Sequence, residues 1–324
     1  MLNSILITGA AGFAGSHLVD LLADGNAAVV AWHRPGGSPA FTAPGTTWQA
    51  VDLLDRDQVR QGIAAVRPAA VYHCAGAPHI GKSWNASEPT FATNVRATHY
   101  LLGALHDAGL DARVMLPSSA MVYQPADRPL DENTPRLPPN PYGVSKLAME
   151  LLGERMASDR LTVTIGRPFN HIGPRQDPVF AAAAFARQIA EIESGRRDNE
   201  LLVGNLAARR EVTDVRDTVR AYRAILERGR STRAYNVSSG EAVAVGDVLE
   251  MLCARASVPI RVRVDPDRFR PNDVPLLVGD ATRLRDELGW TPTIPLARTL
   301  DDLLDYWRGV LRRQHSTRAA HSSR

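Results

Sequence analysis

The fold class is decided by the stretch Thr8-Gly9-Ala10-Ala11-Gly12-Phe13-Ala14-Gly15-Ser16, which follows the short apolar segment 4–8 and precedes a helical pattern over 13–22. Its glycines have the spacing G-x-x-G-x-x-G. At the first strand-to-helix turn of a βαβ unit, such glycines let the backbone approach a pyrophosphate, whose charge faces the helix N-terminus. The stretch therefore predicts a dinucleotide-binding turn lined by Gly9, Gly12, Phe13, Ala14 and Gly15. A merely tight turn is the alternative.

The segments that follow alternate between strand and helix patterns. Strand patterns cover 27–32, 48–53, 69–74, 113–117 and 161–166, and helical patterns cover 57–66, 89–108 and 142–158. Alternation of this kind indicates βαβ units with right-handed crossovers. We expect an α/β fold with a doubly wound parallel Rossmann sheet and ligands at the carboxyl ends of its strands.

The regular alternation of strand and helix patterns ends after about residue 168. Helical patterns cover 181–193, 245–254 and 298–310, strand patterns cover 234–237 and 260–264, and 194–210 is loop-rich. We expect a dinucleotide-binding Rossmann domain over 1–168. A smaller substrate lobe over 169–311 is expected to be partly interleaved with it. A basic, disordered tail is expected over 312–324.

Composition excludes several classes of protein. Of the 324 residues, 44% are hydrophobic and 23% charged, which is ordinary for a soluble globular chain. Cys74 and Cys253 are too few and too far apart to suggest a disulfide framework or a metal site. No apolar run is long enough for a membrane span, and the amino terminus has no basic region or cleavage site. We expect a cytoplasmic protein without a membrane partner.

The net charge of +3 does not indicate a nucleic-acid partner. Four arginines and no acids lie in 312–324, so residues 1–311 carry a net charge of −1. The basic surplus therefore belongs to the end of the chain rather than to a broad basic face.

The end of the second predicted strand bears on the choice between NAD and NADP. An acid there would bind the adenosine ribose hydroxyls, whereas a basic residue suits the additional 2′-phosphate. The chain has His33 and Arg34 and no acid, and Asp52 with Leu53 is better placed for the adenine. This favours NADP, while NAD stays open because Arg34 can also point into solvent.

A Tyr-x-x-x-Lys pattern joins Tyr142 and Lys146, one of only two lysines in the chain. Residues at i and i+4 share one face of a helix. An ammonium beside a phenol favours the phenolate, so Lys146 is expected to lower the pKa of Tyr142 and make it an acid/base. A surface Tyr–Lys pair is the alternative.

Ser118 and Ser119 follow the strand pattern at 113–117. A serine at the carboxyl end of a strand can donate a hydrogen bond to a reacting oxygen and polarise it. Chemistry alone does not choose between the two serines, and a turn could equally require them.

These motifs, with His73-Cys74-Ala75-Gly76-Ala77 and Ser119-Ala120-Met121-Val122-Tyr123, resemble the extended short-chain dehydrogenase/reductase family over residues 4–311. That family contains nucleotide-sugar epimerases, dehydratases and reductases. The resemblance implies Ser119, Tyr142 and Lys146 as catalytic residues. It also implies a homodimer packed through 89–108 and 142–158. Further cofactor contacts are implied for Ala75, Gly76, Ala77, Asn94, Tyr142, Lys146 and Pro168. Gln124 departs from the family's pattern, which has glycine there.

The carboxyl half looks most like the GDP-4-keto-6-deoxy-D-mannose reductases of that family and, more distantly, the GDP-mannose 4,6-dehydratases. The similar segments are 167–174, 185–189, 203–206, 210–217 and 268–275. By that match Asn170, Arg210 and Arg270 hold the nucleotide diphosphate, and two guanidinium groups suit a pyrophosphate. Surface ion pairs are the alternative for the arginines. Lys82, Ser83 and Ser119 are expected near the sugar.

The predicted reaction is NADPH-dependent reduction of the C4 ketone of a nucleotide-linked, GDP-type 4-keto-6-deoxyhexose. Tyr142 protonates the oxygen, Ser119 polarises the ketone, and Lys146 sets the tyrosine pKa. Met121 stands where dehydratases of the family have a basic Glu, which argues against a dehydratase. A C4 epimerase that retains NAD and a non-catalytic nucleotide sensor on the same fold are the other hypotheses.

Overall fold

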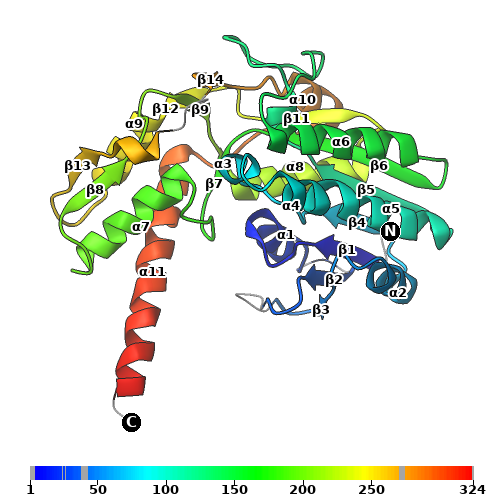
Figure 1. Cartoon of the computed structure of the whole chain (residues 1–324), viewed down its shortest axis with the longest axis horizontal. Helices are drawn as coiled ribbons and strands as arrows, with labels where there is room; N and C mark the ends of the chain where they lie inside the picture. Colours follow the sequence, from blue (N-terminus) through cyan, green and yellow to red (C-terminus); the bar gives the residue numbers. More distant parts are fainter. Residues whose placement is uncertain (1–3, 24, 26, 38–42, 270–273, 323–324) are drawn as a thin grey trace.

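The computed structural model describes residues 4–322 except 24, 26, 38–42 and 270–273, with side chains as far as Gln314. Within this range one large sheet occupies one side of the molecule and a smaller lobe the other (Figure 1). Nothing in the described range forms a helix long and apolar enough to cross a membrane.

Among the described residues, seven parallel strands form the main sheet in the order β11-β6-β5-β4-β1-β2-β3. The strands are β1 (Ser4–Thr8), β2 (Ala28–His33), β3 (Thr46–Ala50), β4 (Ala70–His73), β5 (Ala112–Pro117), β6 (Leu161–Pro168) and β11 (Ala234–Val237). The order reverses direction beside β1, which places the crevice for a ligand at the carboxyl ends of β1 and β4. The predicted Rossmann fold class is confirmed.

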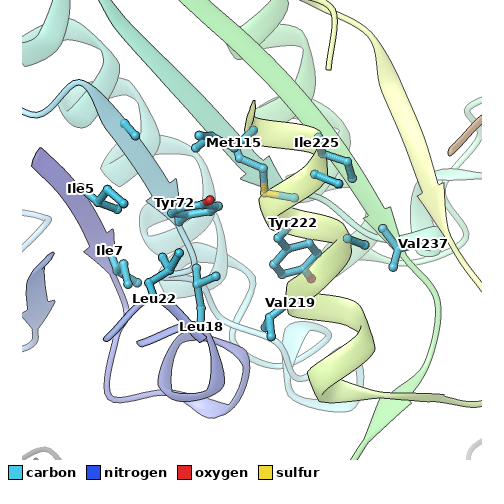
Figure 2. Packing of buried hydrophobic residues seen from close by; sticks show 14 of the residues in the cluster. Ile5, Ile7, Leu18, Leu22, Tyr72, Met115, Val219, Tyr222, Ile225 and Val237 are labelled. Carbon is cyan, nitrogen blue, oxygen red and sulfur yellow. The ribbon is translucent and has the colours of Figure 1, made fainter. Parts of the chain in front are cut away.

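Helices cover both faces of this sheet, so its central strands are apolar along their whole length. The helices α1 (Phe13–Ala23) and α8 (Val215–Arg228) lie on one face, and α2 (Arg56–Val66), α5 (Ala97–Asp107) and α6 (Pro141–Met156) on the other. Figure 2 shows the first layer, where Leu18 and Leu22 of α1 and Tyr222 of α8 pack beside Tyr72 of β4. These two apolar layers fix the strand ends on which the site is built.

The smaller lobe is built from helices around a three-stranded and a two-stranded sheet, and α7 (Ala181–Glu193), α9 (Val245–Cys253) and α11 (Leu296–Ser322) share one apolar core. Its strands are β8 (Glu200–Val203), β9 (Arg209–Glu211), β12 (Ala242–Ala244), β13 (Arg261–Val264) and β14 (Leu276–Leu277). Two further strands, β7 (His171–Ile172) and β10 (Thr213–Asp214), pair with each other. Between these segments the chain returns to the large sheet with α8, β11 and α10 (Thr282–Leu288). The domain boundary at 168 stays a prediction.

Three of the elements expected from the sequence differ from the structure. The expected single helix over 89–108 is instead α4 (Ser87–Phe91), a π-helical turn (Ala92–Arg96) and α5. The expected strand at 48–53 lies earlier, as β3, and the expected loop at 194–210 contains β8 and the start of β9. The remaining short elements are α3 (Ile80–Ser83) and the 3-10 turns Ala120–Val122 and Pro266–Arg268.

The prediction of a disordered tail over 312–324 is wrong for residues 312–322, which continue helix α11. Adding a residue to a formed helix costs far less than starting one, and arginine, glutamine and alanine are good helix formers. The last turns therefore continue the part of α11 that the lobe core nucleates.

Candidate active site

The glycine turn joins β1 to α1 with almost no space for side chains. Gly9 has a φ of +63°, and a Cβ placed on it would lie 2.5 Å from the backbone nitrogen of Ala75. A Cβ on Gly15 would lie 2.2 Å from the carbonyl oxygen of Gly9. The backbone at the exposed Gly12 thus opens directly onto the N-terminus of α1 at Phe13. These residues fit the pyrophosphate of a nicotinamide dinucleotide, which needs close backbone approach and a helix N-terminus.

The ends of β2 and β3 lie side by side next to this turn, as the sequence predicted for the adenosine end of a cofactor. Arg34 and Asp52 are exposed, whereas His33 and Leu53 are half-buried. Asp52 already accepts a hydrogen bond from the backbone of Leu54, at 2.9 Å. Arg34 directly follows β2, the strand at whose end the 2′-phosphate of NADP would lie, and its side chain is exposed there.

A chain of hydrogen bonds beneath the turn fixes the tautomer of His73. Ala75 N–H donates to Thr8 Oγ1 at 3.3 Å, and Thr98 Oγ1 donates to the carbonyl oxygen of Asn94 at 2.7 Å. Thr8 can then donate only to His73 Nδ1 (2.8 Å), and His73 Nε2 donates to Thr98 (3.0 Å). Burial, reinforced by the charge of Lys146, lowers the pKa of His73 to about 3, in agreement with a neutral ring.

Asn94 lies in the π-helical turn and ties the cofactor cleft to helix α6. Its Oδ1 accepts from Ala77 N–H at 2.7 Å, and its Nδ2 donates to Ser145 Oγ at 2.8 Å. A Cβ on Gly76 would lie 3.1 Å from the same Oδ1. π-helical turns recur at functional sites because the additional residue re-aims a side chain. Asn94 therefore shapes the segment 75–77 that the sequence assigned to the cofactor.

The structure distinguishes the two serines after β5. Ser119 Oγ caps the 3-10 turn, accepting from Met121 N–H at 3.1 Å, and its hydroxyl lies close enough to Tyr142 to lower the pKa of that phenol. Within the described structure Ser118 Oγ is buried and has no hydrogen-bond partner. The geometry therefore brings Ser119 together with Tyr142, as the resemblance implied.

Tyr142 and Lys146 occupy successive turns of α6, but their predicted electrostatic relationship is not found. Burial raises the pKa of Tyr142, and the hydrogen bond with Ser119 lowers it by less. Lys146 Nζ instead donates to the carbonyl oxygen of Pro117 at 2.8 Å. In this arrangement burial, rather than Lys146, decides the direction in which the Tyr142 pKa shifts, so the expected lowering of that pKa is not found.

Burial also changes Lys146 itself. It lowers the pKa of the ammonium to about 8, against smaller opposing contributions from Cys74 and Glu150. The Nζ atom would lie 3.5 Å from a Cβ on Gly76, so the ammonium borders the cofactor segment. Glu150 follows one helical turn later and is absent from the residues predicted above. Its spacing of four residues from Lys146 is the sequence signal that could have found it, because such spacing places both side chains on one helix face.

The residues predicted to contact substrate are only partly assembled. Lys82 and Asn170 are exposed, and Arg210 lies on β9, where its guanidinium donates to the carbonyl oxygens of Arg209 (2.9 Å) and Pro275 (3.3 Å). Arg270 lies outside the described residues.

Ser83 differs from its predicted role as a substrate contact. It is fully buried, donates to the carbonyl oxygen of Ile80 (2.7 Å) and accepts from Tyr142 N–H (3.2 Å). A side chain without exposed surface cannot touch a substrate, so the geometry gives Ser83 the task of holding the start of α6. The predicted cofactor contact Pro168 is also buried, at the end of β6.

Comparison with known proteins finds relatives that are nucleotide-sugar enzymes. The model of the family described as GDP-mannose 4,6 dehydratase matches residues 6–303. A GDP-6-deoxy-D-mannose reductase from Pseudomonas aeruginosa is 33% identical over 97% of this chain and 100% of its own. The solved structure of RMD from Pseudomonas aeruginosa, complexed with NADPH, superimposes with a TM-score of 0.81 at 31% identity, covering 94% of this chain and 99% of the other. A Thermus thermophilus UDP-glucose 4-epimerase in complex with NAD gives 0.83 at 27% identity, covering 94% and 99%.

Proposed function

The chain belongs to the GDP-mannose 4,6-dehydratase family, whose members are extended short-chain dehydrogenase/reductase enzymes acting on nucleotide sugars, and from that premise we propose that it reduces the C4 ketone of a GDP-linked 4-keto-6-deoxyhexose with NADPH. The observation that carries the proposal is the pairing of Ser119 with Tyr142 at the carboxyl end of the sheet, beside the glycine turn. Similarity to a GDP-6-deoxy-D-mannose reductase supports the substrate class.

The protein's own groups supply the proton and the polarisation. The chemistry supplied by bound NADPH is transfer of a hydride to the ketone carbon. Ser119 donates a hydrogen bond to the ketone oxygen, and Tyr142 donates the proton that this oxygen needs. Because burial raises the pKa of Tyr142, the phenol is protonated at neutral pH, which is the state a proton donor requires.

Lys146 acts on the cofactor side of the same face of α6. Its ammonium is anchored on the carbonyl oxygen of Pro117 and borders Gly76, which supports a role in holding the nicotinamide ribose. The glycine turn, Ala75, Ala77 and Asn94 hold the rest of the dinucleotide. Arg34 supports a preference for NADPH, as does the NADPH complex of the Pseudomonas aeruginosa relative.

Arg210 and Arg270 are proposed to bind the diphosphate of the nucleotide sugar. Arg210 lies half-buried on β9, the central strand of a three-stranded sheet, and arginine can bind phosphate oxygens through paired charged hydrogen bonds. Asn170 follows β6 and lies on the segment between the sheet and the lobe. Lys82, exposed on α3, is proposed to reach the sugar.

The residue at position 121 bears on two other reactions of the family, 4,6-dehydration and C4 epimerisation. Proton removal from the sugar C5, which a 4,6-dehydratase needs, requires a base, and Met121 is half-buried with its sulfur accepting from Asn140 Nδ2 at 3.6 Å. A C4 epimerase needs only the Ser119, Tyr142 and Lys146 set. The likeness to a UDP-glucose 4-epimerase bound to NAD makes that reaction the second candidate.

The deciding experiment incubates the purified protein with a panel of GDP- and UDP-linked 4-keto-6-deoxy sugars and NADPH. We expect loss of absorbance by the reduced nicotinamide, with a GDP-linked 6-deoxyhexose as product. Interconversion of C4 epimers without added cofactor, by protein that copurifies with NAD, would establish the epimerase instead.

A homodimer is proposed to form through α5 and α6, as the family resemblance implies. Val144 and Leu151 lie two turns apart on α6 and are 42% and 47% exposed, an apolar stripe suited to burial against a second copy. Light scattering of the purified protein tests this. A cytoplasmic location stays a prediction from the sequence.

A further inference from the structure

Helix α6 carries a third functional side chain beneath the catalytic pair. Glu150 stands one turn after Lys146, as Lys146 stands one turn after Tyr142, so the three share one face of the helix. Glu150 is fully buried, and Arg167 at the end of β6 is only 3% exposed. Arg167 binds both carboxylate oxygens, through Nε at 2.9 Å and Nη2 at 2.6 Å. This paired geometry fixes Glu150 as a carboxylate anion.

Arg167 is itself held from two further sides. Its Nη1 donates to the hydroxyl of Tyr123 at 2.9 Å, and its guanidinium lies 4.9 Å from the centre of the Tyr123 ring. The Tyr123 hydroxyl donates in turn to Asn236 Oδ1 of β11 at 2.6 Å. Glu150 is therefore fixed by a network that spans β6, the segment after the Ser119 turn, and β11.

The charges around Lys146 single out Glu150. From the end of β4, His73 is neutral, and burial raises the pKa of the Cys74 thiol to about 12, so the thiol is neutral as well. On α6 itself, Tyr142 is a protonated phenol. Among the described groups that act on the Lys146 ammonium, Glu150 is thus the charged one, and its own cationic partners are Arg167 and, at 3.4 Å, Arg136.

Stability alone does not explain a buried pair of this kind. Removing two charges from water costs about as much as their attraction returns, and well-packed apolar side chains of similar size often serve as well. A carboxylate kept one turn below a buried ammonium needs another reason. We attribute the buried carboxylate to its effect on the charge and the position of Lys146.

We propose that Glu150, clamped by Arg167, is a positioning residue of this site, whose buried carboxylate keeps Lys146 cationic and anchored between Pro117 and Gly76. The role of Lys146 toward the nicotinamide ribose rests on the proposed function. The effect of Glu150 on Lys146 does not, because it is a property of the protein without cofactor or substrate.

The chain is well suited to a direct test, since Lys82 and Lys146 are its only lysines. Protein carrying ¹³C at the lysine ε-carbon gives one signal from each, and Lys82→Arg assigns them. We expect the Lys146 signal to titrate near pH 8 in the parent protein. In Glu150→Gln we expect its midpoint to fall by about one pH unit, as loss of a neighbouring opposite charge requires. The exposed Lys82 is the internal control and should not move.

Two further variants make the outcome decisive. Glu154→Gln removes a carboxylate one turn farther along α6, which shares Arg136 with Glu150 (2.8 Å to Glu154 and 3.4 Å to Glu150). It should leave the Lys146 midpoint unchanged, because Glu150 keeps its charge and its paired bonds to Arg167. Glu150→Gln/Arg167→Gln removes the clamp as well, so that no buried guanidinium is left without its partner, and should still lower the midpoint. If Glu150→Gln alone does not fold, this double variant provides the test of whether Glu150 affects Lys146. An unchanged Lys146 midpoint in the folded double variant overturns the proposal.

A binding measurement connects the titration to function. NADPH affinity of Glu150→Gln should match the parent within about twofold at pH 6.5. At pH 8 it should be about fivefold lower, because there the parent keeps about half of its Lys146 ammonium and the variant only about a tenth. A loss that is equal at both pH values contradicts the proposed role, since it would reflect damaged packing. If the lysine midpoint falls but no sugar is reduced, the proposed function fails while the role of Glu150 stands.

Discussion

The ring of Phe13, in the glycine turn, stacks on the imidazole of His171, with centroids 5.5 Å apart and planes 3° from parallel. His171 Nδ1 is oriented by the carbonyl oxygen of Phe169 at 3.1 Å. One turn along α1, His17 Nε2 bonds the carbonyl oxygen of Pro174 at 2.8 Å. The cofactor turn and the segment after β6, which leads into the substrate lobe, are therefore fastened together.

Phe13→Leu keeps an apolar side chain but removes the stack. A parallel aromatic pair contributes about 1 kcal/mol beyond its buried area, so we expect the melting temperature to fall by about 2 °C. The midpoint is measured by scanning fluorimetry at one protein concentration. Phe269→Leu, at a ring that is 50% exposed, serves as the control and should change the midpoint by less than half as much. Equal shifts would mean that the stack contributes nothing.

Gly15→Ala is expected to abolish dinucleotide binding. The new Cβ would lie 2.2 Å from the carbonyl oxygen of Gly9, so the turn must open and lose its fit to a pyrophosphate. We expect NADPH affinity to fall more than about tenfold, measured by quenching of protein fluorescence. Gly309→Ala in α11 has room for the methyl group, whose nearest neighbour is the flexible Arg313 side chain at 3.4 Å, and should leave binding intact.

His73 should make the protein less stable in acid. Its folded-state pKa of about 3 lies below the unfolded value of about 6.5, so the unfolded chain binds more protons between these limits. Its contribution to stability is complete above pH 6.5 and falls as the pH is lowered toward 3. By pH 5 the loss is about 2 kcal/mol.

The measurement is urea unfolding of the parent and of His73→Asn at pH 7 and pH 5. The difference in unfolding free energy between the two proteins should shrink by about 2 kcal/mol at the lower pH. His106→Asn alters a histidine whose side chain is 68% exposed and should show no such change. A constant difference between parent and His73→Asn would refute the neutral, buried state of this ring.

Arg34→Ser tests the cofactor preference. A charge-assisted hydrogen bond to a phosphate contributes about 1.5–3 kcal/mol, so we expect the ratio of NADPH to NADH affinity to fall by about tenfold or more. The NADH constant itself should hardly change. Arg60→Ser removes an exposed charge from α2 and is the matched control. If both cofactors weaken together, Arg34 does not read the 2′-phosphate.

Tyr142→Phe removes the proton donor and leaves the ring. We expect kcat to fall by about a thousandfold, the range typical of lost general acid catalysis, with NADPH affinity within about twofold of the parent. Stopped-flow absorbance and a binding titration measure the two quantities. Tyr306→Phe on α11 is the control. Retained turnover in Tyr142→Phe would mean that the proton comes from elsewhere.

The sequence was sufficient for features that depend on local spacing. The glycine turn and the Tyr142–Lys146 pair were predicted from fixed intervals, because turn geometry and the helical repeat translate intervals into positions. The choice between Ser118 and Ser119 needed the family resemblance and stays a prediction; of the two, Ser119 is the one that acts on the pKa of Tyr142.

What the sequence could not provide was burial and contact between distant segments. The pKa of Tyr142 depends on how deeply the phenol is packed, and intervals along the chain carry no such information. Arg167 of β6 binds Glu150 of α6 and also Tyr123, and it meets Tyr123 only because β5 and β6 are neighbours in the sheet. The sequence likewise predicts a disordered tail at Arg312 and Arg313, because it shows their charge but not the packing of α11, the helix that extends through them.

The π-helical turn at Ala92–Arg96 sets a phase relationship along the chain. An α-helix advances about 100° per residue, and a π-helical turn contains one residue more than an α-helical turn. The side chains of α4 are therefore rotated by about that angle relative to those of α5. Deletion of a single residue here would straighten the helix and preserve its length almost unchanged. It would also swing Asn94 away from Ala77 and Ser145. Loss of one residue in this segment is thus a larger perturbation than most substitutions, and deletions should be rarer here than in the loops that precede α4 and follow α5.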